Sequence, residues 1–173
     1  AVMVRDRAAA EALAELGPEE RALLAAAERP IVLARRRGGA PVAEAVAPGL
    51  PLLGLLLPYT PLHHLLLAAL DRPLVMTSAN RADEPLVFRD DETVARLSPL
   101  ADLFLTHDRE IAAPCDDSVA RVIAGSPTLL RRGRGFVPKA VRVARPFARP
   151  VLACGGDLKS AVCIGVGDRA WLG

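Results

Sequence analysis

The chain has 173 residues, of which 51% are hydrophobic and 24% are charged, and its formal net charge is +2. This length can bury one hydrophobic core and part of a second, and so small a charge gives no general argument for a nucleic-acid partner. Prolines and charges interrupt every apolar run before the roughly 20 residues of a membrane-spanning helix, and no signal-peptide pattern is present. We therefore expect a cytoplasmic protein without a membrane partner.

Strands and helices are expected to alternate along the chain. Helix starts are marked by Asp6 before an alanine-rich stretch, by Thr60 before a proline, and by the acidic pair at 90–91. Short apolar runs bounded by proline or glycine indicate strands. In chain order we expect a strand at 1–4, helices at 6–16 and 18–27, a strand at 31–33, an apolar run at 50–57, a helix at 61–70, a strand at 74–77, a helix from 90 to about 97, a strand at 102–106, and hairpin strands at 118–123 and 128–131. This order predicts an α/β fold in which helices pack on a twisted mixed sheet.

The character of the sequence changes between Val143 and Pro150. The stretch VARPFARP contains two prolines, which we expect to exclude regular strand pairing. Beyond it, apolar runs alternate with glycine turns, one of them at Gly167-Asp168, and predict a short β-meander that cannot hold its own core. The expected domains are therefore 1–146 and 147–173, the second being an appendage or the first strands of a further domain.

The three cysteines do not predict a disulfide framework or a zinc site. Cys115, Cys154 and Cys163 are odd in number, widely spaced and free of any CxxC pair. We interpret them as ordinary thiols and predict no metal site among them.

Two polar side chains follow the strand expected at 74–77. Ligands of open α/β sheets gather beyond the carboxyl ends of strands, where Ser78 and Asn80 are expected. A hydroxyl and an amide two positions apart can face one crevice and offer hydrogen bonds to a phosphate or an adenine edge. The alternative is a turn in which Ser and Asn satisfy only their own backbone.

A second polar group surrounds the expected hairpin. Asp116, Asp117 and Ser118 precede its first strand, and LLRRGRGFVP, with three arginines and two glycines, ends its second strand. Guanidinium forks match phosphate oxygens, and glycines allow a close approach of the backbone. The alternative for the arginines is a basic strand end exposed to solvent. The two aspartates could be turn residues, hold Mg²⁺ or orient the arginines.

These motifs together resemble a known family. VMTSAN followed by EP, then DDSV and LLRRGRGFVP, with LPYTPLHHLL upstream, are similar to the YrdC-like domain, and most closely to its form in the HypF carbamoyltransferases of NiFe-hydrogenase maturation. The C-terminal stretch VLACGGDLKSAVCIGVGDRAWL resembles the start of the actin-like domain of that family.

The resemblance implies a reaction. Carbamate released from carbamoyl phosphate would condense with ATP to give carbamoyl adenylate and pyrophosphate, before transfer of the carbamoyl group to the C-terminal cysteine of a HypE-like acceptor protein. Mg²⁺ would accompany ATP, while zinc or iron would belong to other parts of the full-length protein. Such chemistry depends on holding two reactants in line and spreading anionic charge over cationic donors.

The resemblance also implies roles for individual residues. Arg131 would be the catalytic group that neutralises phosphate charge. The residues in contact with the nucleotide would be Ser78, Asn80, Ser118, Arg131, Arg132 and Arg134. The residues lining the substrate site would be Thr77, His63, His64, Asp116 and Asp117. Lys159 is a candidate for the second domain, although a lone lysine on a β-turn is more often simply exposed.

The histidine pair does not predict a metal site. Adjacent helix residues project about 100° apart, so His63 and His64 cannot chelate one ion from one face, and we expect only one of them to face the crevice. His107, Asp108 and Arg109 follow an expected strand end and are weaker candidates for the site.

Two features qualify the resemblance. The family usually continues its S-x-N motif with Leu-Ser-Gly-Glu-Pro, whereas this chain has RADEP at 81–85, which leaves the loop geometry open. The chain also opens on a strand and lacks the acylphosphatase, zinc-module and N-terminal Lys/Arg motifs of the family, so we expect a fragment that retains part of a nucleotide site but does not turn over alone.

Two other functions remain open. One is a threonylcarbamoyl-adenylate synthase of tRNA modification, against which LPYTPLHHLL and the C-terminal stretch argue. The other is a non-catalytic domain that binds a nucleotide or RNA through its arginines.

Overall fold

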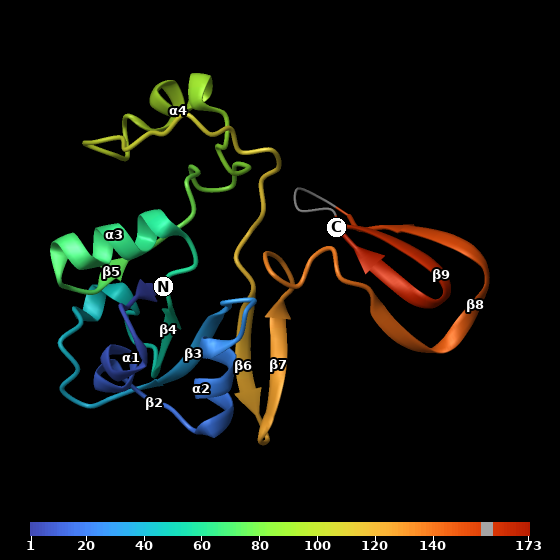
Figure 1. The fold of residues 1–173 in the computed structure, drawn as a ribbon, viewed down its shortest axis with the longest axis horizontal. Helices are drawn as coiled ribbons and strands as arrows, with labels where there is room; N and C mark the ends of the chain where they lie inside the picture. Colours follow the sequence, from blue (N-terminus) through green and yellow to red (C-terminus); the bar gives the residue numbers. More distant parts are fainter. Residues whose placement is uncertain (157–160) are drawn as a thin grey trace.

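The computed structural model describes residues 1–156 and 161–173, which form a seven-stranded sheet with helices and a separate two-stranded sheet (Figure 1). The elements are β1 (Val2–Met3), α1 (Arg7–Leu13), β2 (Ala14–Glu15), α2 (Pro18–Ala25), β3 (Ile31–Arg36), a 3-10 turn (Glu44–Val46), β4 (Leu52–Leu56), α3 (Pro61–Leu70), β5 (Leu74–Val75), α4 (Asp90–Leu97), β6 (Val119–Ile123), β7 (Ser126–Arg131), β8 (Val141–Cys154) and β9 (Val162–Leu172). The predicted α/β class with a mixed sheet is confirmed. No helix in the described part of the chain is both long and apolar enough to span a membrane.

The order of the main sheet brings distant segments together. The strands lie in the order β5-β1-β4-β3-β6-β7, with β2 paired to β3. β1 is parallel to β4 and β3 is parallel to β6, whereas the other neighbours are antiparallel. The late hairpin β6–β7 therefore lies directly beside β3, from the first part of the chain.

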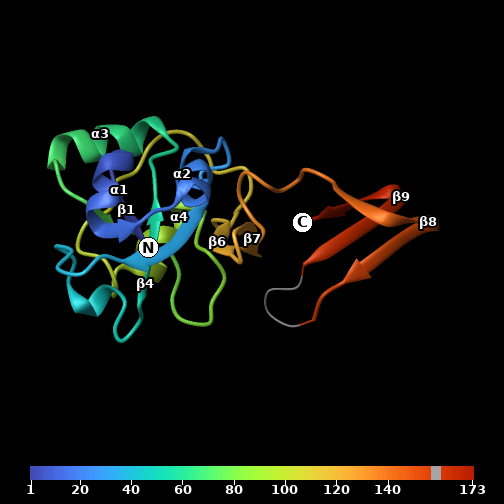
Figure 2. The ribbon, with the colours of Figure 1, turned by 90° about the horizontal axis from the view of Figure 1, so that it is seen from below.

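The two faces of the main sheet carry different cores. Side chains alternate along the strands, so Val2 and Leu55 join the larger cluster with α1 and α2, whereas Met3 and Leu56 join Leu67 of α3 in a smaller cluster on the other face. Figure 2 shows these three helices with the main sheet, apart from β8 and β9. The smaller cluster is the one that matters for the site, because Tyr59 and Met76 pack against it.

Capping residues begin two helices where the sequence predicts. The Asp6 carboxylate accepts a hydrogen bond from the Ala9 amide at 2.8 Å, and the Thr60 hydroxyl accepts one from the His63 amide at 3.2 Å. The expected helix at 6–16 is too long, however. It ends at Leu13 because Ala14 and Glu15 pair with the end of β3 instead.

The predicted strand at 102–106 is wrong. This segment lies on the extended connection between α4 and β6 and forms no strand (Figure 1). Leu103 is 90% exposed and Leu105 is 67% exposed, so its apolar residues do not face a core. Residues 102–106 have no partner strand beside them, so their backbone forms no ladder although the sequence is apolar.

The two prolines interrupt regular pairing, as expected, but they do not end the strand. β8 runs through both of them and pairs with β9 before, between and after them. Its register shifts between Arg142 and Phe147 and again between Phe147 and Val151, so each proline lies where the ladder is irregular. β9 continues through Gly167, which has a φ of 57° and lies opposite Phe147, so there are two long strands rather than a meander with a turn at that glycine.

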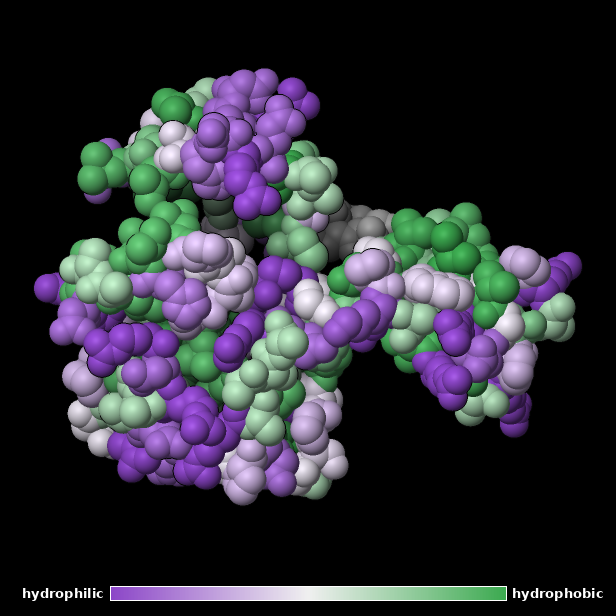
Figure 3. Space-filling view, in the orientation of Figure 1, coloured by the Kyte–Doolittle hydropathy of each residue, from purple (hydrophilic) through white to green (hydrophobic). Residues whose placement is uncertain are grey.

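The two-stranded sheet projects away from the main sheet (Figure 1). Figure 3 shows apolar side chains on its surface. The large exposed ones are Val141, Val151, Leu152, Val162, Ile164 and Val166.

Candidate functional site

A cavity of about 260 Å³ lies where the smaller core meets the ends of several strands. Its lining residues are Ala1, Met3, Ile31, Leu56, Tyr59, Met76, Thr77, Ser78, Asp117 and Arg131. Ligand sites commonly measure about 300–1,000 Å³, so this cavity can enclose part of a nucleotide-sized ligand while the rest lies at its mouth. It unites the two polar groups that the sequence singles out.

The first polar group lies directly after β5. The Met76 amide donates to the Ala1 carbonyl oxygen at 2.8 Å, after which Thr77 and Ser78 leave the sheet and line the cavity. Asn80 is not among the lining residues. It braces the loop, because it accepts a short hydrogen bond from the Ser78 hydroxyl and donates to the backbone oxygens of Arg81 at 2.8 Å and Glu84 at 3.2 Å.

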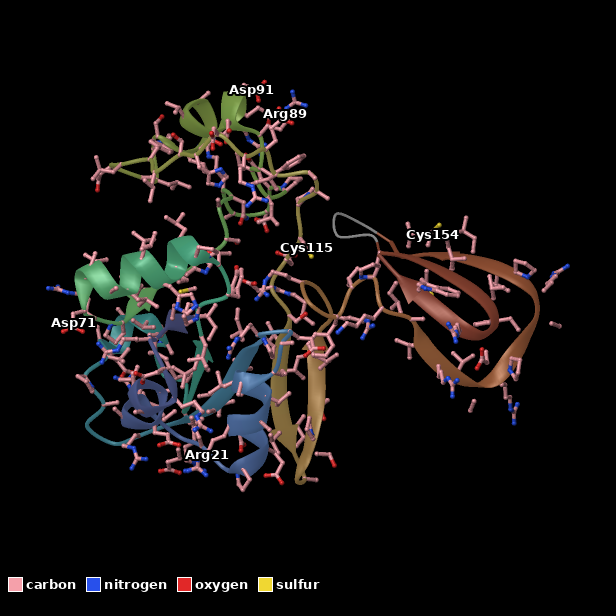
Figure 4. All side chains as sticks on the ribbon, viewed as in Figure 1. Arg21, Asp71, Arg89, Asp91, Cys115 and Cys154 are labelled. Atoms are coloured by element: carbon pink, nitrogen blue, oxygen red, sulfur yellow. The ribbon has the colours of Figure 1, made fainter. Side chains whose placement is uncertain are left out.

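The loop at residues 81–85, whose sequence departs from the family pattern, is also held by α4. The Glu84 carboxylate accepts a hydrogen bond from Arg96 of α4 at 2.8 Å, and Arg96 also contacts Glu92. Figure 4 shows Arg89 and Asp91 of α4 well away from the main sheet. The Ser78 loop is thus the link between the cavity and α4.

Ser118 is placed inside the hairpin rather than in the cavity. Its side chain is fully buried, donates to the Arg134 carbonyl oxygen at 2.9 Å and accepts from the Gly133 amide at 2.8 Å. A direct contact with a nucleotide would require the hydroxyl to leave both partners. In this structure Ser118 instead anchors the loop that follows β7.

The three arginines at the end of the hairpin have different environments. Arg131 is exposed, lines the cavity, and makes no side-chain hydrogen bond or ion pair with any residue that the structure describes. Arg132 donates to the backbone oxygens of Phe136 at 2.9 Å and Lys139 at 2.7 Å. Arg134 is also bound within the chain, so Arg131 is the guanidinium available to a ligand.

Of the two aspartates, Asp117 lines the cavity and Asp116 does not. Asp117 accepts a hydrogen bond from Arg134 at 2.8 Å through one carboxylate oxygen. The Asp116 backbone oxygen accepts from the Arg134 amide at 2.8 Å. Within residues 1–156 and 161–173, no group of three or more His, Cys, Asp or Glu side chains could hold a metal ion.

The two histidines differ in exposure, and neither lines the cavity. His63 contacts Tyr59 edge to face, with 4.5 Å between the ring centroids, whereas His64 is exposed. Burial lowers the pKa of His63, and Arg134 and His64 lower it further while Asp117 opposes the change. Its Nδ1 is buried without a hydrogen-bond partner among the described residues, and the ring reaches the cavity only through Tyr59.

The remaining candidates lie elsewhere. His107, Asp108 and Arg109 are exposed on the connection to β6, where the Arg109 amide donates to the His107 ring at 3.2 Å. Lys159 lies outside the described residues. Figure 4 shows Cys115 on the segment that enters β6 and Cys154 on the separate sheet, and the cysteines are all free thiols.

Sequence reasoning missed Tyr59. Its ring lines the cavity and carries the Arg134 guanidinium 3.3 Å from its centroid. Burial, together with the nearby Asp117 charge, raises the pKa of its phenol, so the hydroxyl stays protonated at neutral pH. The signal was present, because this is the single tyrosine of a chain with only 3% aromatic residues and it lies within PYTP.

Comparison with known proteins gives a consistent result. A family model for Sua5, YciO and YrdC, described as "Telomere recombination", matches residues 1–133. Carbamoyltransferase HypF2 of Cupriavidus necator is 48% identical over 191 residues, covering 99% of this chain and 23% of its own length. Carbamoyltransferase HypF of Rhizobium leguminosarum bv. viciae is 47% identical over 179 residues, with the same two shares.

A solved structure agrees over the whole length of the chain. The crystal structure of full-length HypF in the phosphate- and nucleotide-bound form aligns with a TM-score of 0.92 and 37% identity, over 99% of this chain and 27% of that one. The chain thus spans about a quarter of the length of its relatives. By the match of the family model over residues 1–133, the chain belongs to the Sua5/YciO/YrdC domain family, and over nearly its whole length it is similar to a part of the HypF carbamoyltransferases.

Proposed function

We propose that this chain provides the nucleotide site at which a HypF carbamoyltransferase forms carbamoyl adenylate from ATP and carbamate derived from carbamoyl phosphate. The observation that carries the proposal is that Ser78 and Arg131, more than fifty positions apart in the sequence, line one cavity together with Asp117. The name of the nucleotide- and phosphate-bound HypF structure supports the same ligand class.

The cavity offers suitable groups for such a reaction. A carbamate oxygen would attack the α-phosphorus, a new P–O bond would form, and pyrophosphate would leave with the electron pair of the broken bond. Arg131 would neutralise charge on the phosphates, and Thr77 would offer a hydroxyl donor nearby. Ser78, whose hydroxyl donates to Asn80, would contact the nucleotide through its hydroxyl oxygen. No covalent bond to the protein is required.

Mg²⁺ would enter as part of the ATP complex. Protein sites for nucleotide-bound Mg²⁺ often use only one or two carboxylates, the other ligands being phosphate oxygens and water. Asp117 brings one carboxylate to the cavity and uses one of its oxygens to accept from Arg134, so it fits such a shared ion and not a metal held by protein alone. The HypE-like acceptor would receive the carbamoyl group in a later step. The whole reaction would take place in the cytoplasm.

Nucleotide binding tests the proposal. Calorimetric titration of the 173-residue chain with MgATP should give saturable binding, and Arg131→Gln should weaken it about tenfold or more, because a charge-assisted contact is lost. Arg121→Gln is a matched control, since Arg121 is an exposed arginine of the same hairpin that does not line the cavity. Absence of ATP binding, or equal effects of the two substitutions, would contradict the proposal.

The reaction and its rivals need separate measurements. We expect no pyrophosphate release from this chain alone, and release by the full-length protein with carbamoyl phosphate and ATP. Release that instead requires threonine and bicarbonate would favour a threonylcarbamoyl-adenylate synthase. Tight RNA binding that falls steeply with salt and ignores ATP would favour the non-catalytic alternative.

A further inference from the structure

Arg134 is bound on every side by the chain itself. Its Nε donates to Asp117 at 2.8 Å, and its two terminal nitrogens donate to the backbone oxygens of Glu28 at 3.1 Å and Arg29 at 2.8 Å. Its guanidinium plane also lies 3.3 Å from the centroid of the Tyr59 ring. These partners lie in the connection between α2 and β3, in the connection between β4 and α3, and just before β6. One side chain therefore joins three separate segments.

The glycines beside Arg134 serve the same packing. A Cβ on Gly133 would lie 2.2 Å from the Asp116 backbone oxygen, and a Cβ on Gly135 would lie 2.6 Å from that of Glu28. The loop can therefore approach Asp116 and Glu28 only with glycine at these positions. The sequence suggested that these glycines let the backbone approach a phosphate, but in the structure they let it approach the chain.

Two of the groups that Arg134 holds line the cavity. Asp117 and Tyr59 are lining residues, whereas Arg134 is not. An arginine that already donates to a carboxylate and two carbonyl oxygens has few donors left for a phosphate. Its rigid fork fixes the position of each acceptor, which a lysine ammonium on a flexible stem does not do.

We propose that Arg134 is a positioning residue that holds Asp117 and Tyr59 as one wall of the nucleotide cavity, leaving Arg131 as the guanidinium that meets the anionic ligand. This inference rests on the proposed nucleotide-binding function and adds a division of labour within the RRGRG loop. The arginine that looks equally suited to phosphate in the sequence acts on the ligand only through its neighbours.

Salt dependence of ATP binding separates the two roles. Exposed charge pairs are screened by salt, whereas the shape of a cavity wall is not. Arg131→Gln should lower ATP affinity about tenfold at low salt and converge on the unsubstituted chain at high salt. Arg134→Gln and Arg134→Lys should lower it by a similar factor at every salt concentration, with Arg121→Gln unchanged.

A spectroscopic measurement reports on the wall without any ligand. Because Tyr59 is the only tyrosine, a chain labelled with fluorotyrosine gives a single ¹⁹F resonance. Arg134→Gln and Arg134→Lys should shift that resonance, while Arg131→Gln and Arg121→Gln should leave it in place. Circular dichroism checks that each variant is folded, and Arg134→Lys carries the test if Arg134→Gln is not.

The outcomes separate this inference from the function on which it rests. If the loss caused by Arg134→Gln disappears at high salt, or if Arg134→Lys binds ATP normally, Arg134 acts as a charge and the inference is overturned. An unmoved ¹⁹F resonance in both Arg134 variants also overturns it. If the unsubstituted chain binds no ATP, the proposed function fails, whereas the ¹⁹F comparison still decides whether Arg134 holds Tyr59.

Discussion

At the scale of single residues, the candidate site consists of a few exposed polar groups supported by less exposed ones. Ser78 and Arg131 are exposed and line the cavity, whereas Asn80, Ser118 and Arg134 do not line it and donate hydrogen bonds to backbone oxygens of the chain. Residue type alone does not separate the two groups, because arginine, serine and asparagine suit either task. The two groups differ in whether the side chain donates to a backbone oxygen of the folded chain.

His63 should make the stability of the protein depend on pH. Its pKa in the folded chain lies below the ordinary value of 6.5, because burial disfavours the imidazolium. As pH falls through 6.5, the unfolded chain takes up a proton that the folded chain resists, so the free energy of unfolding decreases, and above this pH the effect is absent.

Urea unfolding between about pH 7.5 and pH 5.5 measures this effect. His63→Gln should flatten the decrease in stability over that interval. His64→Gln is the comparison, since it removes an exposed imidazole from the same helix and should change the slope less than His63→Gln does. An identical slope in all three proteins would show that His63 protonates without cost in the folded state.

At the scale of elements, local signals predicted what local interactions decide. The Thr60 cap and the following proline placed α3 at Pro61–Leu70, as observed. The segment at 102–106 was misread, because strand formation there depends on whether a partner strand is present. The prolines of β8 make the ladder irregular, as expected, but the strand continues because β9 lies beside it. In the same way, the sequence brought Ser78 and Arg131 into one hypothesis but left the role of Arg134 open, since its partner Glu28 is 106 positions away.

Gly135 should be among the least replaceable residues of the hairpin loop. Its φ of +86° disfavours any side chain by about 1–2 kcal/mol, and a Cβ would also clash with Glu28. Gly135→Ala should therefore lower the free energy of unfolding by more than that amount, as measured in urea. Gly125→Ala is a matched control, because Gly125 also has a positive φ, of +76°, but nothing within 4 Å of its Cβ position. Equal losses for both would mean that the contact with Glu28 relaxes freely.

At the scale of the whole molecule, the two sheets are separate structures. In the part of the chain that the structure describes, β8 and β9 pair with each other and not with the main sheet. Both core clusters lie within the main sheet and its helices. The division into domains at 1–146 and 147–173 stays a prediction, and the second sheet already begins at Val141.

A chain ending at Ala140 should retain the main fold and its ligand site. It keeps the ion pair between Lys139 and Glu28, at 2.6 Å, and removes the exposed apolar residues of β8 and β9. We expect a single cooperative thermal transition, ATP affinity within about twofold of the 173-residue chain, and less aggregation on heating. Loss of the cooperative transition would mean that the hairpin supports the main sheet.

The attachment of Arg134 to Glu28 also bears on how the protein folds. A contact across 106 positions closes a long loop, and such contacts are unfavourable until most of the intervening chain is in place. The contacts of the cavity wall should therefore form after the folding transition state. A saturating nucleotide would then slow unfolding and leave the refolding rate nearly unchanged, a pattern that stopped-flow kinetics can resolve.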